Sequence, residues 1–257
     1  MTALCGVAGT NRDNADVSEL AVEAAPRRGR VWVILGFALA LGALGYSAVS
    51  ISTQEPESEV VRVAGISDSQ RLFGGVPQEG DRLGSSDAPV SIQIFNDLQC
   101  SSCRAAFVGT IPGLVEDYAR PGDAQLLMRH YSVARNPLEI GFFGAEAAAE
   151  QGYGWQYTYL FFRNQDEAER LGIDDEFMES LAGSIGNLEV PEWRETLDRE
   201  EGTDSPIAQR LEGYEQLGTE LGIRAGGAAI VNGPGGTQTL QDGPTLAQIE
   251  RAIAEVE

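Results

Sequence analysis

The stretch that decides the fold is Ala88-Pro-Val-Ser-Ile-Gln-Ile-Phe95, followed directly by Asn96-Asp-Leu-Gln-Cys-Ser-Ser-Cys103. In its first half the apolar residues at 90, 92 and 94 alternate with polar ones, which predicts a β-strand. The next four residues, 96–99, are typical of a turn. Apolar residues then recur at three- and four-residue spacing, which predicts a helix over residues 102–118. The sequence therefore places two cysteines where a strand passes into a helix.

A Cys-x-x-Cys pair in this position suits thiol–disulfide exchange. The reaction needs a thiolate nucleophile and a second thiol close enough to release the mixed disulfide. The helix start lowers the pKa of the first thiol, so we interpret Cys100 as the attacking cysteine and Cys103 as the resolving one. The hydroxyls of Ser101 and Ser102 can donate hydrogen bonds to the thiolate. Asp97 could tune the thiol or cap the turn.

Two other interpretations of the pair are weaker. A zinc site usually needs four ligands, and after residue 52 the only Cys and His residues are Cys100, Cys103 and His130. A purely structural disulfide across two residues would close a very small loop and contribute little. We therefore expect no metal and no cofactor. His130 lies in a predicted strand, where a structural role is expected.

The rest of the chain predicts a strand, a long helical block, a hairpin and a final helix. Strands are expected at 125–133, 228–231 and 237–240, with helices at 139–151, 155–164, 174–185, 206–221 and 245–256. The aromatic residues of the helical block are expected in its core, namely Trp155, Tyr157, Tyr159, Phe161 and Phe162.

Residues 31–52 form an uncharged hydrophobic run of 22 residues. As a helix it would span roughly 33 Å, enough to cross a bilayer. Arg27, Arg28 and Arg30 precede the run, which predicts a cytoplasmic tail at 1–30 and the main domain outside. A signal peptide cleaved near residues 47–52 is the alternative. Cys5 belongs to the predicted cytoplasmic tail.

The net charge of −21 lies entirely after residue 30, because the first 30 residues carry four arginines and four acids. An anionic domain repels nucleic acid, so we expect no nucleic-acid partner. Residues 53–82 are rich in Glu, Gly, Ser, Asp and Pro and predict a tether that becomes partly ordered against the domain. The domain proper is expected at 83–257.

Four segments of the chain are similar to one known family: residues 83–90, 95–103, 155–165 and 222–233. They resemble the membrane-anchored DsbA-like thiol-disulfide oxidoreductases, over roughly residues 72–257. The resemblance implies an α/β thioredoxin-like fold with an inserted helical domain at about 137–221, preceded by one transmembrane helix. It also implies a loop of Gly226, Gly227 and Ala228 beside the disulfide.

The chain departs from that family at two places. The loop normally carries Thr or Val followed by a cis-proline, and Gly226-Gly227 stands there instead, which predicts a different loop backbone. Many relatives have a Glu six residues before the first cysteine, where this chain has Ile94. Ser101-Ser102 stands between the cysteines in place of the His or Pro of the family's strongest oxidants, which predicts a less oxidising couple than that of the His-containing enzymes.

The resemblance implies formation or exchange of disulfides in thiol-containing exported proteins, with a membrane redox partner for recycling. A non-catalytic thioredoxin-like binding module and a client-specific disulfide reductase are the two alternatives.

Overall fold

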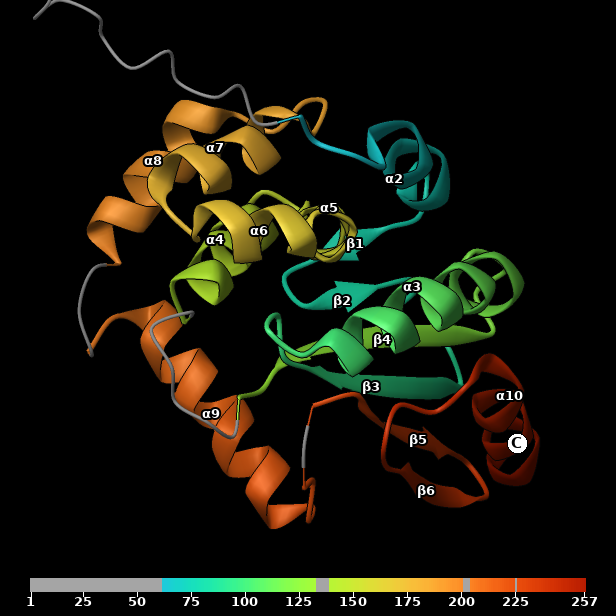
Figure 1. The fold of residues 1–257 in the computed structure, drawn as a ribbon. Coiled ribbons are helices and arrows are strands. Elements are labelled where there is room, and N and C mark those ends of the chain that lie inside the picture. The colour runs from blue at the N-terminus through green and yellow to red at the C-terminus, as the bar shows by residue number, and fades with distance from the viewer. Residues whose placement is uncertain (1–61, 133–138, 201–203, 225) are drawn as a thin grey trace, which may run out of the picture. The chain divides into compact units, whose positions relative to one another are not determined.

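The computed structural model describes residues 62–132, 139–200, 204–224 and 226–257 (Figure 1). They belong to one compact unit, Val60–Glu257. Within the described residues no helix is both long and apolar enough to cross a membrane. The hydrophobic run at 31–52 and the predicted tail at 1–30 lie outside those residues.

The unit is built on a six-stranded sheet in the order β1-β2-β4-β3-β5-β6. Its centre is β3 (Val90–Asn96) and β4 (Ala124–His130), which run parallel, while the other pairs are antiparallel. The outer strands are β1 (Gln78–Glu79), β2 (Arg82–Leu83), β5 (Ala228–Gly233) and β6 (Gly236–Leu240). The four strands predicted from alternation and short apolar runs are confirmed.

Helices cover both faces of the sheet. On one face lie α3 (Ser101–Leu114), continued by the π-helical turn η1 (Val115–Ala119), and α10 (Leu246–Val256). On the other face, Leu217 of α9 (Pro206–Glu220) packs against a small cluster that includes Phe95. Alternation along β3 explains this division, because Ile94 and Phe95 point to opposite faces.

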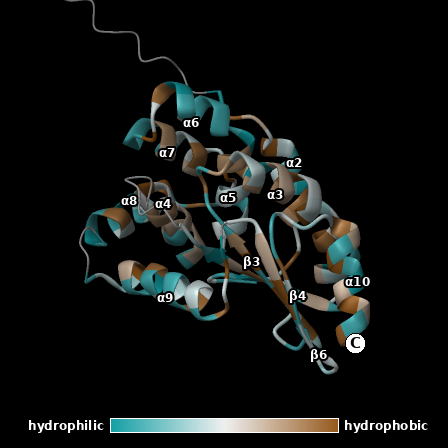
Figure 2. Cartoon of the chain, turned by 60° about the horizontal axis from the view of Figure 1, so that its bottom comes forward, coloured by the Kyte–Doolittle hydropathy of each residue, from teal (hydrophilic) through white to brown (hydrophobic). Residues whose placement is uncertain are grey.

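A helical block lies between β4 and α9, within the range of about 137–221 that was predicted for the insertion. Its members are α4 (Glu139–Glu150), α5 (Gly154–Arg163), α6 (Gln165–Leu171), α7 (Asp175–Gly183) and α8 (Val190–Arg199). The five aromatic side chains of α5 expected in the core are at most 3% exposed, which confirms that prediction. Figure 2 shows hydrophobic colour on β3 and β4 and mixed colour on α10, as expected of an amphipathic surface helix.

Residues expected in the tether contribute to this unit. Helix α2 (Ile66–Phe73) buries Ser69, Leu72 and Phe73, and β1 pairs with β2. Arg120 donates to the carbonyls of Leu72 and Gly74, which ties the end of α2 to the end of η1. The sequence did not predict this helix, because its eight residues stand among glycines and polar side chains.

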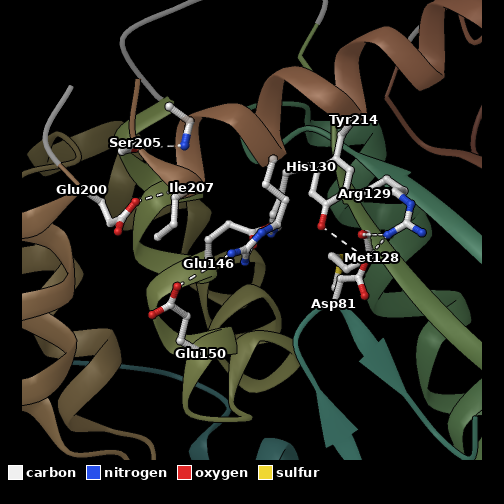
Figure 3. A network of polar contacts seen from close by, with 12 residues as sticks. Asp81, Met128, Arg129, His130, Glu146, Glu150, Glu200, Ser205, Ile207 and Tyr214 are labelled. Atoms are coloured by element: carbon white, nitrogen blue, oxygen red, sulfur yellow. Dashed lines mark hydrogen bonds and ion pairs between the residues drawn. The ribbon is translucent and has the colours of Figure 1, made fainter. Parts of the chain in front are cut away.

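A polar network joins the sheet to the helical insertion (Figure 3). The Asp81 carboxylate pairs with Arg129 of β4 and accepts a hydrogen bond of 3.3 Å from the Tyr214 hydroxyl of α9. On α4, the buried Glu146 carboxylate accepts a hydrogen bond of 2.8 Å from Arg210 of α9. Burial raises the pKa of Glu146 to about 7, although Arg210 opposes the rise.

Candidate functional site

Cys100 and Cys103 form a disulfide at the start of α3, with their Cα atoms 5.1 Å apart. Cys100 is the N-cap of the helix: its Sγ accepts the Cys103 backbone N–H at 3.0 Å. The Ser102 hydroxyl also lies 3.1 Å from that sulfur. The first sulfur therefore faces the unpaired amide end of the helix, where a thiolate is stabilised.

Burial separates the roles of the two cysteines. Cys100 is half-buried, whereas Cys103 is 2% exposed. An incoming thiolate can reach only a sulfur that is accessible from solvent. The structure therefore offers Cys100 for attack and keeps Cys103 as the internal partner. Ser101, the other residue predicted to tune the pair, is exposed on the first turn of α3.

The predicted loop lies against the disulfide. A methyl group built on Gly226 would stand 2.8 Å from the Cys103 sulfur and 2.9 Å from Cβ of Asp97. One built on Gly227 would stand 3.6 Å from the same sulfur. Ala228 begins β5 beside Phe95 and is buried. The chain path thus brings the glycine loop, which is far away in sequence, against Asp97 and Cys103.

The backbone of Gly227 differs from that of a proline. Its φ is +81°, and proline is held near −65°. Its N–H donates to the Phe95 carbonyl at 2.7 Å, and its own carbonyl accepts from the Gly243 N–H at 2.7 Å. A proline could neither adopt this conformation nor supply that N–H. The loop at Gly226-Gly227 therefore has a different backbone from a loop that carries a proline there.

A small cavity of about 20 Å³ lies beside Cys103, with room for one water molecule. Ile94, Asn96 and Thr110 line it together with Gly227. Ile94, at the position where the family resemblance led us to expect a Glu, is buried. An apolar side chain, which cannot exchange protons, therefore lines the same cavity as the buried Cys103.

Asp97 acts as the turn-capping residue. Its Oδ1 accepts the Gln99 N–H at 2.9 Å, and its carbonyl accepts the Cys100 N–H at 3.1 Å. These two bonds shape the connection between β3 and α3. Of the two roles predicted for Asp97, tuning the thiol or capping the turn, these contacts support the capping role.

His130 is 3% exposed and lies at the end of β4, next to Asn96 in the sheet register. Its ring stacks on Phe142, and its Nδ1 lies 3.3 Å from Oδ1 of Asn96. Burial and the nearby Arg129 charge lower the pKa of His130 to about 3, so the ring is neutral at physiological pH. These contacts give it a structural role. Among the described residues no group of three or more His, Cys, Asp and Glu side chains could hold a metal ion.

Helix α6 supplies contacts to the site that the sequence did not suggest. Gln165 is 2% exposed and its Nε2 donates to the Leu98 carbonyl at 2.6 Å. Asp166 forms a two-pronged ion pair with Arg104 of α3, with 3.1 Å between Nη2 and Oδ2. The Arg104 hydrogen bond lowers the pKa of Asp166, and the same bond raises the pKa of Arg104.

The fold and site together define a thioredoxin-fold protein with a helical insertion and a cysteine pair at the start of the first long helix after the central strand. A family model described as thioredoxin matches residues 78–210. The chain belongs to this family. The resemblance to DsbA-like proteins expected from the sequence is confirmed by the relatives that follow.

Two relatives are disulfide bond formation proteins D of bacilli. The one from Bacillus cereus, described as probable, is 26% identical over 137 residues, which are 50% of this chain and 63% of the relative. The one from Bacillus subtilis is 22% identical over 152 residues, 58% of this chain and 66% of the relative. The matches thus span slightly less than two thirds of these two relatives.

The solved structure of oxidised BdbD from Bacillus subtilis shares the fold. It superposes with a TM-score of 0.58 at 20% identity, over 70% of this chain and 96% of that structure. A structure of DsbA from Chlamydia trachomatis gives a TM-score of 0.52 at 18% identity, over 68% of this chain and 90% of the other.

Proposed function

We propose that this protein is an extracytoplasmic thiol-disulfide oxidoreductase that forms or exchanges disulfides in exported proteins. The observation that carries the proposal is the Cys100–Cys103 disulfide at the start of α3, with one accessible and one buried sulfur. The relatives from Bacillus species that are named disulfide bond formation proteins support it. No cofactor takes part in the proposed reaction.

The reaction balances over two thiol–disulfide exchanges. A client thiolate attacks Sγ of Cys100, the Cys100–Cys103 bond breaks, and Cys103 leaves as a thiolate that takes up a proton. A second client thiol, after losing its proton, attacks the client sulfur of the mixed disulfide and releases Cys100 as a thiolate. The client loses two electrons and the pair gains them. A thiol oxidant in the membrane, the proposed recycling partner, then removes those electrons.

We place this chemistry outside the cytoplasm. Residues 31–52 would form the single-pass anchor and the arginines before them would hold residues 1–30 inside. Residues 226–228 would form the wall against which a client segment lies next to the disulfide. Clients are exported proteins with free thiols, and nucleic acid is excluded by the anionic charge.

A second candidate, a non-catalytic binding module, is favoured by the loop alone. Gly227 has both backbone groups engaged within the chain, by Phe95 and Gly243, where the family's loop supports docking of a client strand. A protein that kept the disulfide but lost this docking would bind partners without turning them over. The client-specific reductase differs from the oxidase in the direction of electron flow, because it passes electrons to its client.

One experiment separates the three. The full-length protein in detergent is mixed with reduced ribonuclease A and glutathione buffer, and recovery of ribonuclease activity is followed. We expect acceleration by the wild type and by Cys5→Ser, the control thiol, with loss of acceleration in Cys100→Ser. Equal rates for wild type and Cys100→Ser would favour the binding module. A reduction potential near −270 mV, that of thioredoxin, would favour the reductase.

A further inference from the structure

The ion pair between Arg104 and Asp166 links α3, the helix that begins at the redox pair, to α6 of the insertion. Arg104 is one residue after Cys103, and its backbone N–H donates to the Cys100 carbonyl at 3.0 Å. Asp166 comes from α6 of the insertion, 62 residues away. Arg104 thus follows Cys100 by one helical turn of α3. Its guanidinium is bound by a carboxylate from another part of the fold.

The direction of the Arg104 side chain strengthens this placement. In an α-helix each Cα–Cβ bond tilts toward the N-terminus, and residues four apart share a face. Arg104 therefore leans along α3 toward the end where Cys100 lies. Helix α6 approaches the same end, since Gln165 donates to the Leu98 carbonyl two residues before Cys100.

We infer that Arg104 and Asp166 are positioning residues that set the redox potential of the cysteine pair, Arg104 by stabilising the Cys100 thiolate and Asp166 by limiting that effect. The inference rests on the proposed function and deepens it, because it names how the fold regulates that site. In this inference neither residue takes part in the sulfur exchange itself.

The sign of each effect follows from the half-reaction. Reduction of the disulfide takes up two electrons, and above the pKa of Cys100 it takes up one proton, on Cys103. A charge that stabilises the Cys100 thiolate therefore stabilises the reduced form and makes the couple more oxidising. Asp166→Asn leaves Arg104 without its carboxylate partner and should make the couple more oxidising. Arg104→Gln removes the cation and should shift it the opposite way.

The expected size is modest because the pair is open to water: the Asp166 side chain is 77% exposed and that of Arg104 31%. A unit charge about one helical turn away in a partly solvated site shifts a pKa by about half to one unit. The equilibrium constant with glutathione should change by roughly threefold to tenfold, and threefold corresponds to about 14 mV for a two-electron couple.

The test uses the full-length protein with Cys5→Ser in every variant, so that only the pair titrates. The pKa of Cys100 is measured by thiolate absorbance at 240 nm, and the equilibrium with glutathione at pH 8. The variants are Asp166→Asn, Arg104→Gln, the double variant, and Glu167→Gln as a control. Glu167 is the next acid on α6, where it pairs with Arg170.

The inference predicts opposite shifts in the two single variants, a double variant close to wild type, and no shift in Glu167→Gln. Gln165→Leu, which removes an uncharged contact to the same loop, shows what loosening alone does to the potential. Shifts of Asp166→Asn and Arg104→Gln in the same direction, or none in either, would overturn the inference. Because these quantities are measured without a client, failure of the ribonuclease assay is a separate result.

Discussion

The close contact between Gly226 and the buried cysteine leads to a prediction whose size can be worked out from the structure. Replacing Gly226 with alanine adds a methyl group 2.8 Å from the Cys103 sulfur, 2.9 Å from Cβ of Asp97 and 3.0 Å from the Asp97 backbone nitrogen. Ordinary contact begins near 3.4 Å, so the loop or the disulfide must move by about 0.6 Å, the difference from 2.8 Å. None of the three atoms is the free end of a flexible side chain.

Insertion of a methyl group into a well-packed site costs about 1–3 kcal/mol. For a domain of this size each kcal/mol lowers the melting temperature by about 2–4 °C, so we expect Gly226→Ala to melt roughly 2–12 °C below the wild type. The cost comes from the contacts of the new methyl group with Cys103 and Asp97.

Gly109→Ala is the matched control. Gly109 is exposed within α3, and a methyl group there meets nothing within 4 Å. Alanine in a helix interior is favoured over glycine by about 0.5–1 kcal/mol, so this variant should melt at the wild-type temperature or slightly above it. Thermal unfolding of the oxidised proteins, followed by circular dichroism, measures both. If Gly226→Ala melted within 1 °C of the wild type while the control behaved as expected, the tight packing of the loop on Cys103 would be refuted.

Three further predictions concern Gly227 in the loop and two buried titratable side chains, His130 and Glu146. Gly227→Pro should destabilise the fold by about 3 kcal/mol or more in urea unfolding, because proline cannot reach φ +81° and removes the hydrogen bond to Phe95; an unchanged midpoint would contradict this. The folded pKa of His130, about 3, lies below the unfolded value of 6.5, so the wild type should lose stability as pH falls through that window. His130→Gln should remove about 2–3 kcal/mol of the loss between pH 7 and 4.5, measured by urea unfolding at both values. Glu146 has the opposite sign: its folded pKa of about 7 exceeds the unfolded 4.5, so its contribution falls as pH rises through that window, and Glu146→Gln should lack this slope.

Much of the local structure could be predicted from the chain. The alternation in β3, the spacing in α3 and the aromatic run of α5 each report which side of an element is buried, because that periodicity is written in neighbouring residues. The Cys100–Cys103 pair could be located for the same reason, since its place between a strand and a helix is a local property. The short helix α2 could not, because eight residues give too few turns for a reliable period.

The surroundings of the pair were decided by the tertiary structure. Asp166 has no local feature that marks it as the partner of Arg104, because their meeting depends on how α6 packs on α3. The family resemblance placed the loop of Gly226 and Gly227 beside the disulfide, but the sequence does not give the close approach of Gly226 to Cys103 or the positive φ of Gly227. Contacts between residues tens of positions apart depend on the path of the whole chain, whereas strands, helices and a four-residue motif depend on their immediate neighbours.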